Sequence, residues 1–330
     1  MKGLVLGVES TAHTFSASVV SSDGRILSNP KSIYKAPQGS GIHPFEASQN
    51  HLSAAPSVLE EALRSSGAEL SDLSAVAYAM GPGLGPCLRV GAVAARTLAA
   101  SRGLPLVPVN HAVGHIELGC LLTGARDPVV LLVSGGHTMI IAYSGRRWRI
   151  LGESLDLTLG QLLDQFGRHH GLASPCGRAI EDAASRSGTY LRLPYSVKGN
   201  DVSFSGLLTA SKSLLDRGVP FEDVSYSLQE TSFSMVAEVT ERALAFTGKK
   251  EVMIVGGVAA NKRLSKMMTV MAGRHSAKVL AVPLEYSGDC GAEIAWTGAL
   301  AHACGVEVPV AGSAVRQSWR LDVVDIPWRS

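Results

Sequence analysis

The stretch Val109-Asn110-His111-Ala112-Val113-Gly114-His115-Ile116-Glu117 organises the rest of this sequence. It follows a short apolar run, residues 104–109, that predicts a strand, and it opens a segment that predicts a helix over residues 111–122. Positions four apart lie on one face of a helix, so His111 and His115 can present two imidazoles to a single point. Two imidazoles and one carboxylate are a common ligand set for iron or zinc that leaves coordination positions open.

Chance is the competing explanation for this pair, because the chain has ten histidines among its 330 residues. Two features favour the metal site. The pair lies at a strand-to-helix turn, where α/β proteins place their sites, and a matching carboxylate follows far along the chain. The spacing differs from that of zinc peptidases, because Ala112 stands where the His-Glu-x-x-His pattern carries its glutamate base.

The composition indicates a globular protein with two domains or one duplicated domain. Hydrophobic residues make up 46% of the chain and charged residues 18%, which excludes a disordered protein. The net charge of +2 is too small for a strong nucleic-acid footprint. No apolar run reaches the roughly 20 residues of a membrane span, and the first residues do not resemble a signal peptide. We therefore expect a cytoplasmic protein without a membrane partner, whose five cysteines stay free thiols.

The predicted elements repeat once along the chain. The expected strands are 4–8, 15–20, a third strand that residues 25–28 lead into, 76–80 and 104–109, and then 129–133, 139–143, 148–151, 252–255 and 278–282. The expected helices are 45–65, 90–100 and 111–122, and then 225–246, 261–271 and 291–304. Two such halves facing each other predict an α/β, duplicated actin-like fold of the sugar kinase and Hsp70 type, with a cleft between them. We expect the halves at 1–127 and 128–330, the second with an insertion at about 152–222.

Two glycine turns are candidates for contacts with a nucleotide. Ser134-Gly135-Gly136 joins two apolar strands, and main-chain N–H groups in such a turn can bind phosphate where glycine permits close approach. The strand, Gly-Gly and helix pattern of residues 255–261 suits an adenosine contact. An ordinary hairpin and simple close packing of helix on strand are the competing explanations.

Several runs together resemble the universal tRNA threonylcarbamoyl transferases, called TsaD in bacteria and the Kae-type catalytic subunit of the KEOPS complex in archaea and eukaryotes. They span nearly the whole chain in order, and the first run and the tail are archaeal in type. The runs are Glu9–Thr14, Gly81–Arg89, Asn110–Glu117, Val133–Thr138, Phe204–Leu207, Val255–Leu264, Tyr286–Asp289 and the tail Arg316-Gln317…Trp328-Arg329.

The resemblance implies transfer of a threonylcarbamoyl group from its adenylate to the exocyclic amine of the adenosine beside the anticodon, in tRNAs that read codons beginning with A. It implies one divalent metal ion, iron favoured and zinc the alternative, on His111, His115 and Asp289. It also implies an adenine nucleotide in the cleft (threonylcarbamoyl-AMP, with ATP as a further candidate). Implied partners are tRNA and other KEOPS subunits, including a small atypical kinase and a small dimerisation subunit. Substrate residues carried over by motif are Leu132, Val133, Ser134, Gly135, Gly136, Asp164, Gly177, Glu181 and Asn261.

The sequence departs from the family pattern at four positions. Leu132 stands where archaeal relatives usually carry a tyrosine that can reach the metal, so we expect no phenolate ligand. Cys176 and Arg178 replace glycine and proline around Gly177, which puts the backbone there in doubt. Cys290 replaces an asparagine next to the expected metal ligand, where its thiol can either pack or interfere with the metal.

We predict an acyl transfer in which the metal acts as a Lewis acid and the turns position the adenylate. AMP is a good leaving group, so we assign no protein general base. The alternatives are a metalloendopeptidase, an actin-like ATPase or small-molecule kinase, and a non-catalytic tRNA-binding module. The missing glutamate base argues against the first. Metal-dependent phosphorylation of a metabolite would support the second, and function without metal would support the third.

The repeat also predicts how the metal site is built. Strand 104–109 leads into His111 at a helix start, and strand 278–282 leads through residues 286–288 to Asp289, again before a helix. These positions are equivalent in the two halves, so pseudo-symmetry would bring the helix starts together across the cleft. The alternative is that Asp289 merely caps its own helix.

Overall fold

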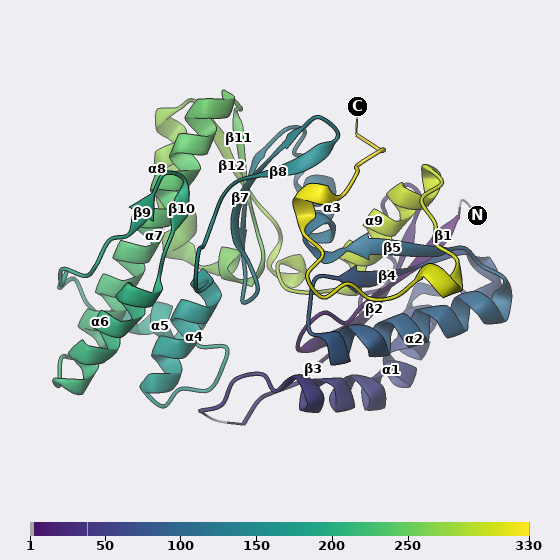
Figure 1. The fold of residues 1–330 in the computed structure, drawn as a ribbon, viewed down its shortest axis with the longest axis horizontal. Coiled ribbons are helices and arrows are strands. Elements are labelled where there is room, and N and C mark those ends of the chain that lie inside the picture. Colours follow the sequence, from purple (N-terminus) through teal and green to yellow (C-terminus); the bar gives the residue numbers. More distant parts are fainter. Residues whose placement is uncertain (1–2, 38, 330) are drawn as a thin grey trace.

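The computed structural model describes residues 3–37 and 39–329 and has two halves built on one plan (Figure 1). Within these residues each half contains a five-stranded sheet, in the orders β3-β2-β1-β4-β5 and β12-β11-β6-β7-β8. β1 and β6 are the corresponding central strands, because each pairs antiparallel with the next strand and parallel with a strand much later in the chain. The sheets therefore confirm the duplicated α/β fold.

The first sheet consists of β1 (Leu4–Glu9), β2 (Thr14–Ser21), β3 (Lys31–Ile33), β4 (Leu73–Gly81) and β5 (Leu106–Asn110). The second consists of β6 (Val129–Val133), β7 (Thr138–Ser144), β8 (Arg147–Glu153), β11 (Glu251–Val255) and β12 (Lys278–Ala281).

The sequence analysis expects residues 25–28 to lead into a third strand, and this strand, β3, begins at Lys31. Along residues 25–28 only an isolated bridge forms, between Ile26 and Val20, among the described residues. The Ser28 side chain takes part in the pairing instead of its main chain, since Val19 N–H donates to Ser28 Oγ at 3.1 Å. Pro30 has no N–H to donate to a ladder, so regular pairing begins only after it.

Helices cover both faces of each sheet. α1 (Pro44–Ser66) and α2 (Gly85–Arg102) pack on the outer face of the first sheet, and α7 (Phe221–Thr247) and α8 (Lys262–Arg274) pack on the outer face of the second. Short 3-10 turns lie at Leu70–Asp72, Gly257–Ala260, Leu284–Tyr286, Val310–Gly312 and Leu321–Val323.

The two remaining helices of the repeat are exchanged between the halves. α3 (His111–Thr123) leaves the first sheet but packs on the second, where Ile116 joins a cluster with Leu132 and Met253. α9 (Gly291–Ala303) leaves the second sheet but packs on the first, where Ile294 joins a cluster with Ala77. The two helices also pack against each other, so they form the centre of the molecule (Figure 1).

Glycines let α9 lie directly on the first sheet. A methyl group added at Gly7 of β1 would lie 2.1 Å from the main-chain nitrogen of Ala295. One added at Gly298 would lie 2.3 Å from Cβ of Ala77 in β4. Such contacts leave α9 no room to shift toward the sheet, and they fix the segment that leads into it.

The second half carries extra elements between β8 and α7. They are α4 (Leu159–His169), α5 (Gly177–Ala184), the short strands β9 (Val197–Lys198) and β10 (Asp201–Val202), and α6 (Ser205–Asp216). The division of the chain at residues 127 and 128 stays a prediction, because α3 and α9 each pack across it.

The sequence analysis expects free cysteines and no membrane span. All five cysteines are free, as predicted. Across the part of the chain that the structure describes, we find no helix with the length and apolarity that a membrane crossing requires.

Candidate metal centre

The first two expected ligands are held by the start of α3. His111 is the first residue of this helix, and His115 lies one turn later. Asn110 caps the helix, since its Oδ1 accepts hydrogen bonds from the N–H groups of Ala112 at 3.1 Å and Val113 at 3.2 Å. The cap fixes the residue at which the helix begins, and it thereby fixes the main-chain positions from which both imidazoles project. Their ring centroids are 4.6 Å apart, and both side chains are buried.

Asp289 approaches the same point from the segment before α9. Its Oδ1 lies 3.4 Å from Nε2 of His115 and 3.8 Å from Nε2 of His111. Two ligand atoms at about 2.1 Å from a tetrahedral ion lie about 3.4 Å apart, so this spacing suits a divalent metal. His115 Nε2 is also buried without a hydrogen-bond partner among the described residues. The three side chains therefore fit a metal ion.

Two carboxylates that the sequence analysis did not identify hold the other imidazole nitrogens. Glu293, on α9, lies with Oε2 2.6 Å from His115 Nδ1 and with Oε1 3.2 Å from His111 Nδ1. Glu9, at the end of β1, lies with Oε2 3.1 Å from His111 Nδ1. Both carboxylates are fully buried. This arrangement orients the rings and leaves both Nε2 atoms for a metal, as supporting carboxylates commonly do.

Glu293 lies close enough to His111, His115 and Asp289 to be counted as a fourth ligand. Its contacts with both Nδ1 atoms favour the supporting role instead. A signal for it exists in the sequence, because it follows Asp289 by four residues. Glu9 carries no comparable signal, because only the folded sheet brings it to α3.

The pKa values of the buried ionisable groups depend strongly on the charges of their neighbours. Burial alone would lower the pKa of His111, but the carboxylates of Glu9 and Glu293 outweigh burial and hold that pKa well above its ordinary value. Burial would raise the pKa of Asp289, but contact with the two histidines holds it far below its ordinary value. With neutral imidazoles the three carboxylates leave an excess of negative charge, which favours a divalent cation.

The capping alternative for Asp289 is wrong. The residue at the cap position of α9 is Cys290, whose side chain makes no cap hydrogen bond, and the Gly291 N–H at the start of the helix donates to Ser16 Oγ at 2.9 Å instead. The Cys290 side chain packs with Leu118 of α3 and Ala292. Burial raises the pKa of the Cys290 thiol, so it stays protonated and packs as a small apolar group.

The expected phosphate turn, Ser134-Gly135-Gly136, lies between β6 and β7. Gly135 and Gly136 are exposed, and a methyl group added at Gly135 would meet no atom within 4 Å. The turn is held from within, since Ser134 Oγ accepts hydrogen bonds from Gly136 N–H at 3.1 Å and His137 N–H at 3.0 Å. The fold itself therefore leaves space at these glycines.

Two backbone segments press against this turn. A methyl group added at Gly160 of α4 would lie 2.5 Å from the carbonyl oxygen of Ser134. One added at Gly256 would lie 2.4 Å from the carbonyl oxygen of Val133, and Gly256 also has φ +93°, which L side chains rarely adopt. The turn thus meets the start of the insertion and the Gly-Gly segment after β11.

Leu132 and Val133 differ from the other expected substrate residues, because both side chains are fully buried. Leu132 packs in the cluster with α3, and Val133 packs on the opposite face of β6 in the core of the second half. Only their main-chain atoms can contact a ligand. A leucine at 132 therefore fills the core beside the metal helix.

Asp164, on α4, holds the chain just before Gly177. Its Oδ1 accepts a hydrogen bond from Cys176 N–H at 2.7 Å. Cys176 fits because a glycine faces it, since a methyl group added at Gly167 would lie 2.4 Å from Cys176 Cβ. Arg178 is exposed and pairs with an aspartate one turn later. The structure accommodates both departures, and α5 begins at Gly177.

Glu181 and Asn261 lie together where α5 meets α8. Glu181 Oε1 accepts a hydrogen bond from Lys262 N–H at 2.8 Å. Asn261 caps α8 with its Oδ1 and donates from Nδ2 to Gln229 Oε1 at 2.7 Å. Asp164, Glu181 and Asn261 therefore each accept a hydrogen bond from the main chain at the start of a helix or just before it.

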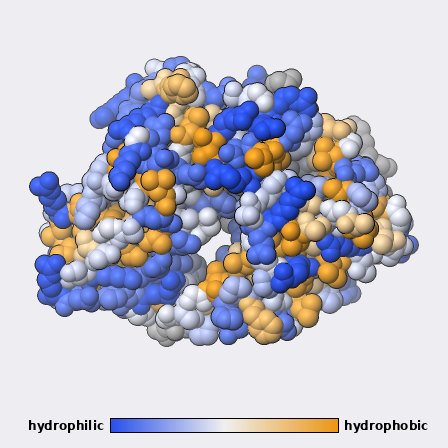
Figure 2. Space-filling view, in the orientation of Figure 1, coloured by the Kyte–Doolittle hydropathy of each residue, from blue (hydrophilic) through white to orange (hydrophobic). Residues whose placement is uncertain are grey.

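The turn and the metal centre adjoin each other. His137 follows Gly136, and its ring centroid lies 6.0 Å from that of His111. The space-filling view is hollowed between the two halves (Figure 2). A nucleotide on the turn would thus have a metal within reach.

Solved structures share the fold at low sequence identity. HypF from T. kodakarensis superposes with a TM-score of 0.65 at 15% identity, over 92% of this chain and 48% of that one. Component A of (R)-2-hydroxyglutaryl-CoA dehydratase from Acidaminococcus fermentans gives 0.58 at 12% identity, over 92% and 100%. The architecture is therefore actin-like, as predicted.

Sequence comparison identifies the family. The model of TsaD, tRNA N6-adenosine threonylcarbamoyltransferase, matches residues 25–296. Transferases of that name from Caldivirga maquilingensis and Thermofilum pendens are each 50% identical, over 98% and 99% of this chain and 98% and 97% of theirs. A probable bifunctional tRNA threonylcarbamoyladenosine biosynthesis protein from Methanothermobacter thermautotrophicus is 48% identical, over 98% of this chain and 61% of that protein.

The chain belongs to the tRNA N6-adenosine threonylcarbamoyltransferase family. It is a transferase that takes part in forming threonylcarbamoyladenosine in tRNA. This membership implies a metal ion and a nucleotide-related substrate, and the cluster of His111, His115, Asp289 and Glu293 offers the metal a site.

We expect Asp289→Asn to lower metal affinity by at least about tenfold, because losing even an outer partner of a metal usually costs that much. The apo protein should lose only the stability that the Asp289 carboxylate gains from His111 and His115, because Asp289 caps no helix. Metal content and thermal unfolding measure the two effects. Glu285→Gln, an exposed carboxylate four residues earlier, is the matched control. Full metal occupancy in the Asp289 variant would contradict the site.

We expect Gly135→Val to fold normally, because the added atoms meet open space. It should weaken adenylate binding by about tenfold or more, since one lost charge-assisted hydrogen bond is worth roughly that factor. Calorimetry with a non-reactive adenylate analogue measures the effect, with Gly188→Val, another glycine with open space around it, as control. Unchanged affinity in the Gly135 variant would rule out phosphate binding at this turn.

Proposed function

We propose that threonylcarbamoyl-AMP is the donor and that the acceptor is N6 of the adenosine beside the anticodon, in tRNAs that read codons beginning with A. The nearness of the turn to the histidines carries this proposal, with 6.0 Å between the rings of His137 and His111. A donor whose phosphate lies on the turn has its carbamoyl end beside the metal centre.

The turn offers a main-chain donor to the phosphate. Gly135 N–H has no acceptor among the described residues, whereas its carbonyl oxygen accepts from Thr158 Oγ1 at 2.9 Å. Thr158 thereby fixes the peptide unit between Gly135 and Gly136, while the Gly135 N–H in the preceding unit stays available to a ligand. We propose that Leu132 and Val133 contribute main-chain contacts and that Asp164, Gly177, Glu181 and Asn261 line the remainder of the adenylate site.

We propose that His111, His115 and Asp289 hold iron, with zinc as the alternative. When bound, the metal supplies a Lewis acid for the carbamoyl carbonyl or the threonyl carboxylate. Glu9 and Glu293 keep both rings oriented with Nε2 toward the metal. Three protein ligands leave positions open for the substrate.

The transfer step needs little acid–base help from the protein. The N6 nitrogen attacks the carbamoyl carbon, a C–N bond forms, and the C–O bond to the phosphate breaks. AMP leaves with the bonding electron pair, and N6 gives up one proton. Because AMP is a good leaving group, orientation of donor and acceptor is the main contribution of the chain.

Two alternative activities have weaker support. A metalloendopeptidase needs a free carboxylate base near the metal, but Ala112 stands at the usual position, and Glu9 and Glu293 contact imidazole nitrogens. An ATPase or small-molecule kinase is supported by the fold alone, which hosts many chemistries.

Transfer of label from threonylcarbamoyl-AMP to tRNA tests the proposal, with partner subunits present and absent. We expect label on tRNA and none on tRNA that carries inosine in place of the adenosine beside the anticodon, because inosine lacks the exocyclic amine. Chelation should abolish transfer, and added iron should restore it. Equal labelling of the inosine tRNA would contradict the proposed acceptor, and peptide cleavage or metabolite phosphorylation in its place would favour an alternative.

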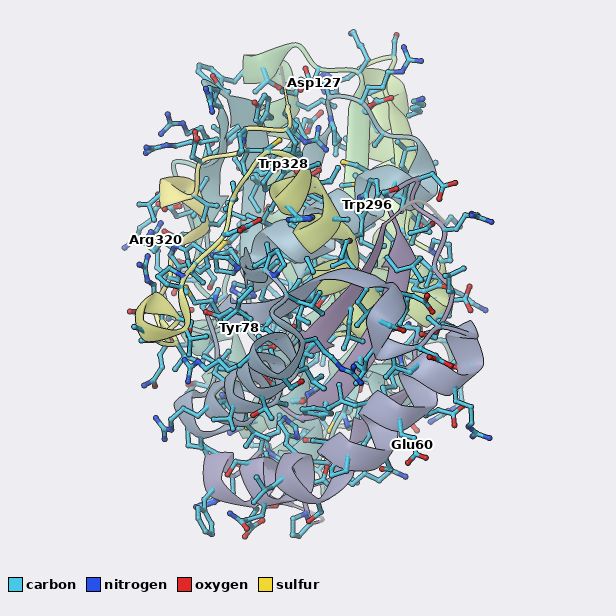
Figure 3. All side chains as sticks on the ribbon, turned by 90° about the vertical axis from the view of Figure 1, so that its right-hand side faces the viewer. Glu60, Tyr78, Asp127, Trp296, Arg320 and Trp328 are labelled. Atoms are coloured by element: carbon cyan, nitrogen blue, oxygen red, sulfur yellow. The ribbon has the colours of Figure 1, made fainter. Side chains whose placement is uncertain are left out.

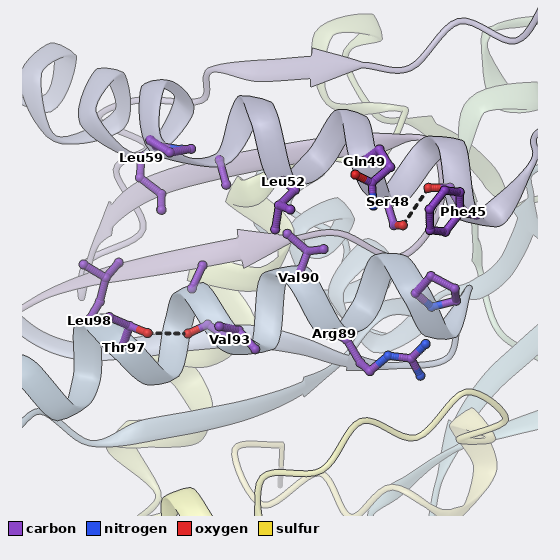
Figure 4. Close-up of a pocket in the computed structure, with 14 residues that line it drawn as sticks. Phe45, Ser48, Gln49, Leu52, Leu59, Arg89, Val90, Val93, Thr97 and Leu98 are labelled. Atoms are coloured by element: carbon purple, nitrogen blue, oxygen red, sulfur yellow. Dashed lines mark hydrogen bonds between the residues drawn. The ribbon is translucent and has the colours of Figure 1, made fainter.

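We further propose that partner subunits bind this chain and that the small dimerisation subunit occupies the groove between α1 and α2. These helices run side by side in the same direction and leave an apolar groove (Figure 4). Three large side chains along it, Phe45, Leu52 and Val93, are more than half exposed, at 62%, 59% and 56%. Such a groove between two helices suits a third helix with an apolar face.

We expect Leu52→Glu to weaken binding of that subunit by about tenfold or more, because a carboxylate would be buried without a partner. The isolated chain should keep its melting temperature, since Leu52 is mostly exposed. Phe246→Glu, at an 80% exposed position on α7, is the control. Titration of the purified subunit measures the effect, and unchanged affinity would exclude this groove.

A further inference from the structure

The C-terminal tail, residues 313–329, crosses from the first half to the second. It starts against the first sheet, where Tyr78 donates a hydrogen bond to the carbonyl oxygen of Ser313 at 3.0 Å. Figure 3 follows the tail from near Tyr78 past Arg320 to Trp328. Along this path Asn110, the cap of α3, donates from Nδ2 to the carbonyl oxygen of Trp319 at 3.0 Å. The tail therefore touches the start of the helix that carries the two histidines.

The tail ends at a second contact with the same helix. Arg329 donates to the Glu117 carboxylate from Nε, at 2.9 Å from Oε1, and from Nη2, at 2.8 Å from Oε2. Its guanidinium lies over the ring of Trp148, 4.8 Å from the centroid, and Trp148 Nε1 donates to Glu117 Oε1 at 2.9 Å. Tyr143 donates to the carbonyl oxygen of Arg329 at 2.9 Å. Glu117 is 3% exposed and the Arg329 side chain 16%, so the carboxylate is buried and most of the guanidinium side is covered.

Glu117 lies on the side of α3 opposite to the imidazoles. Successive residues of an α-helix are turned by about 100°, so position 117 is about 200° from position 115 and about 240° from position 111. Asp289 and Glu293 contact the imidazole side, and Arg329 contacts the other side. The helix is thus held from both sides against rotation about its axis.

We propose that Arg329 is a positioning residue for the metal centre, acting through Glu117 to set the rotation of α3. This inference rests on the proposed metal site at His111, His115 and Asp289. A side-chain atom about 5 Å from a helix axis moves by about 1 Å when the helix turns by about 10°. Displacement by 1 Å is enough to impair a metal or catalytic site.

Helix packing alone does not set this rotation. α3 is apolar on nearly all sides, and its buried residues include Ala112, Val113, Ile116, Leu118 and Cys120. Such a helix can turn slightly and still bury the same kinds of side chain, whereas a two-point hydrogen bond between a guanidinium and a carboxylate fixes direction. The ion pair between Arg329 and Glu117 is therefore the contact that specifies the rotation of α3, whereas the apolar contacts around it do not.

The double variant Glu117→Met, Arg329→Met separates positioning from simple stability. Replacing both members of a buried ion pair by apolar residues of similar size usually preserves the fold. We expect a folded apo protein with a somewhat lower melting temperature, because the buried Trp148 Nε1 loses its acceptor. Binding of Co²⁺ should weaken about tenfold or more, and the visible absorption of bound Co²⁺ should change. Arg329→Lys, which keeps the charge but not the two-point geometry, should give an intermediate effect. Arg320→Met, which removes an exposed ion pair with Glu153 from the same tail, is the control and should bind like wild type.

The measurements distinguish a failure of the positioning role from a failure of the metal site. Wild-type affinity and spectrum in the folded double variant would overturn the positioning role of Arg329. The same outcome in His111→Ala would instead overturn the metal site itself. If the double variant does not fold, Co²⁺ spectra of Arg329→Lys decide: a wild-type spectrum and affinity in this variant count against positioning, and an altered spectrum supports it.

Discussion

The contact between α3 and α9 is the constraint on which the rest of the structure depends. Each helix leaves one sheet and packs on the other, so neither half is covered on its inner face without the other. The exchange brings His111 and His115 from one half against Asp289 and Glu293 from the other. A metal bound there would favour the state in which the two halves are assembled, because a ligand stabilises the state that binds it.

Burial of so many ionisable groups at this contact has an electrostatic cost. Glu9 and Glu293 are fully buried, and isolated charges in such surroundings are strongly unfavourable. Pairing with the imidazoles offsets part of that cost, and burial raises the pKa of Glu9 despite the attraction of His111. A divalent cation would offset more, so the arrangement is better explained by metal binding than by stability of the apo protein.

The sequence could predict features with a local signal. The repeated order of strands and helices predicts the duplicated fold, and the equivalence of positions 111 and 289 in that repeat predicts their approach. Features that depend on tertiary contacts could not be predicted. The apolar pattern of α3 shows that it is buried but not which sheet covers it, and Glu9 meets His111 only in the folded sheet. The residue at which β3 begins could not be predicted either, because the side chain of Ser28 accepts a hydrogen bond from the Val19 N–H ahead of the regular ladder.

Anomalous scattering from a crystal of the metal-loaded protein tests the central claim most directly. We expect one strong site, about 2.0–2.2 Å from Nε2 of His111, Nε2 of His115 and a carboxylate oxygen of Asp289. Glu293 should stay on the Nδ1 atoms, outside bonding distance of the metal. A metal bound through Nδ1 and Glu293, or one held by residues of a single half, would contradict the account.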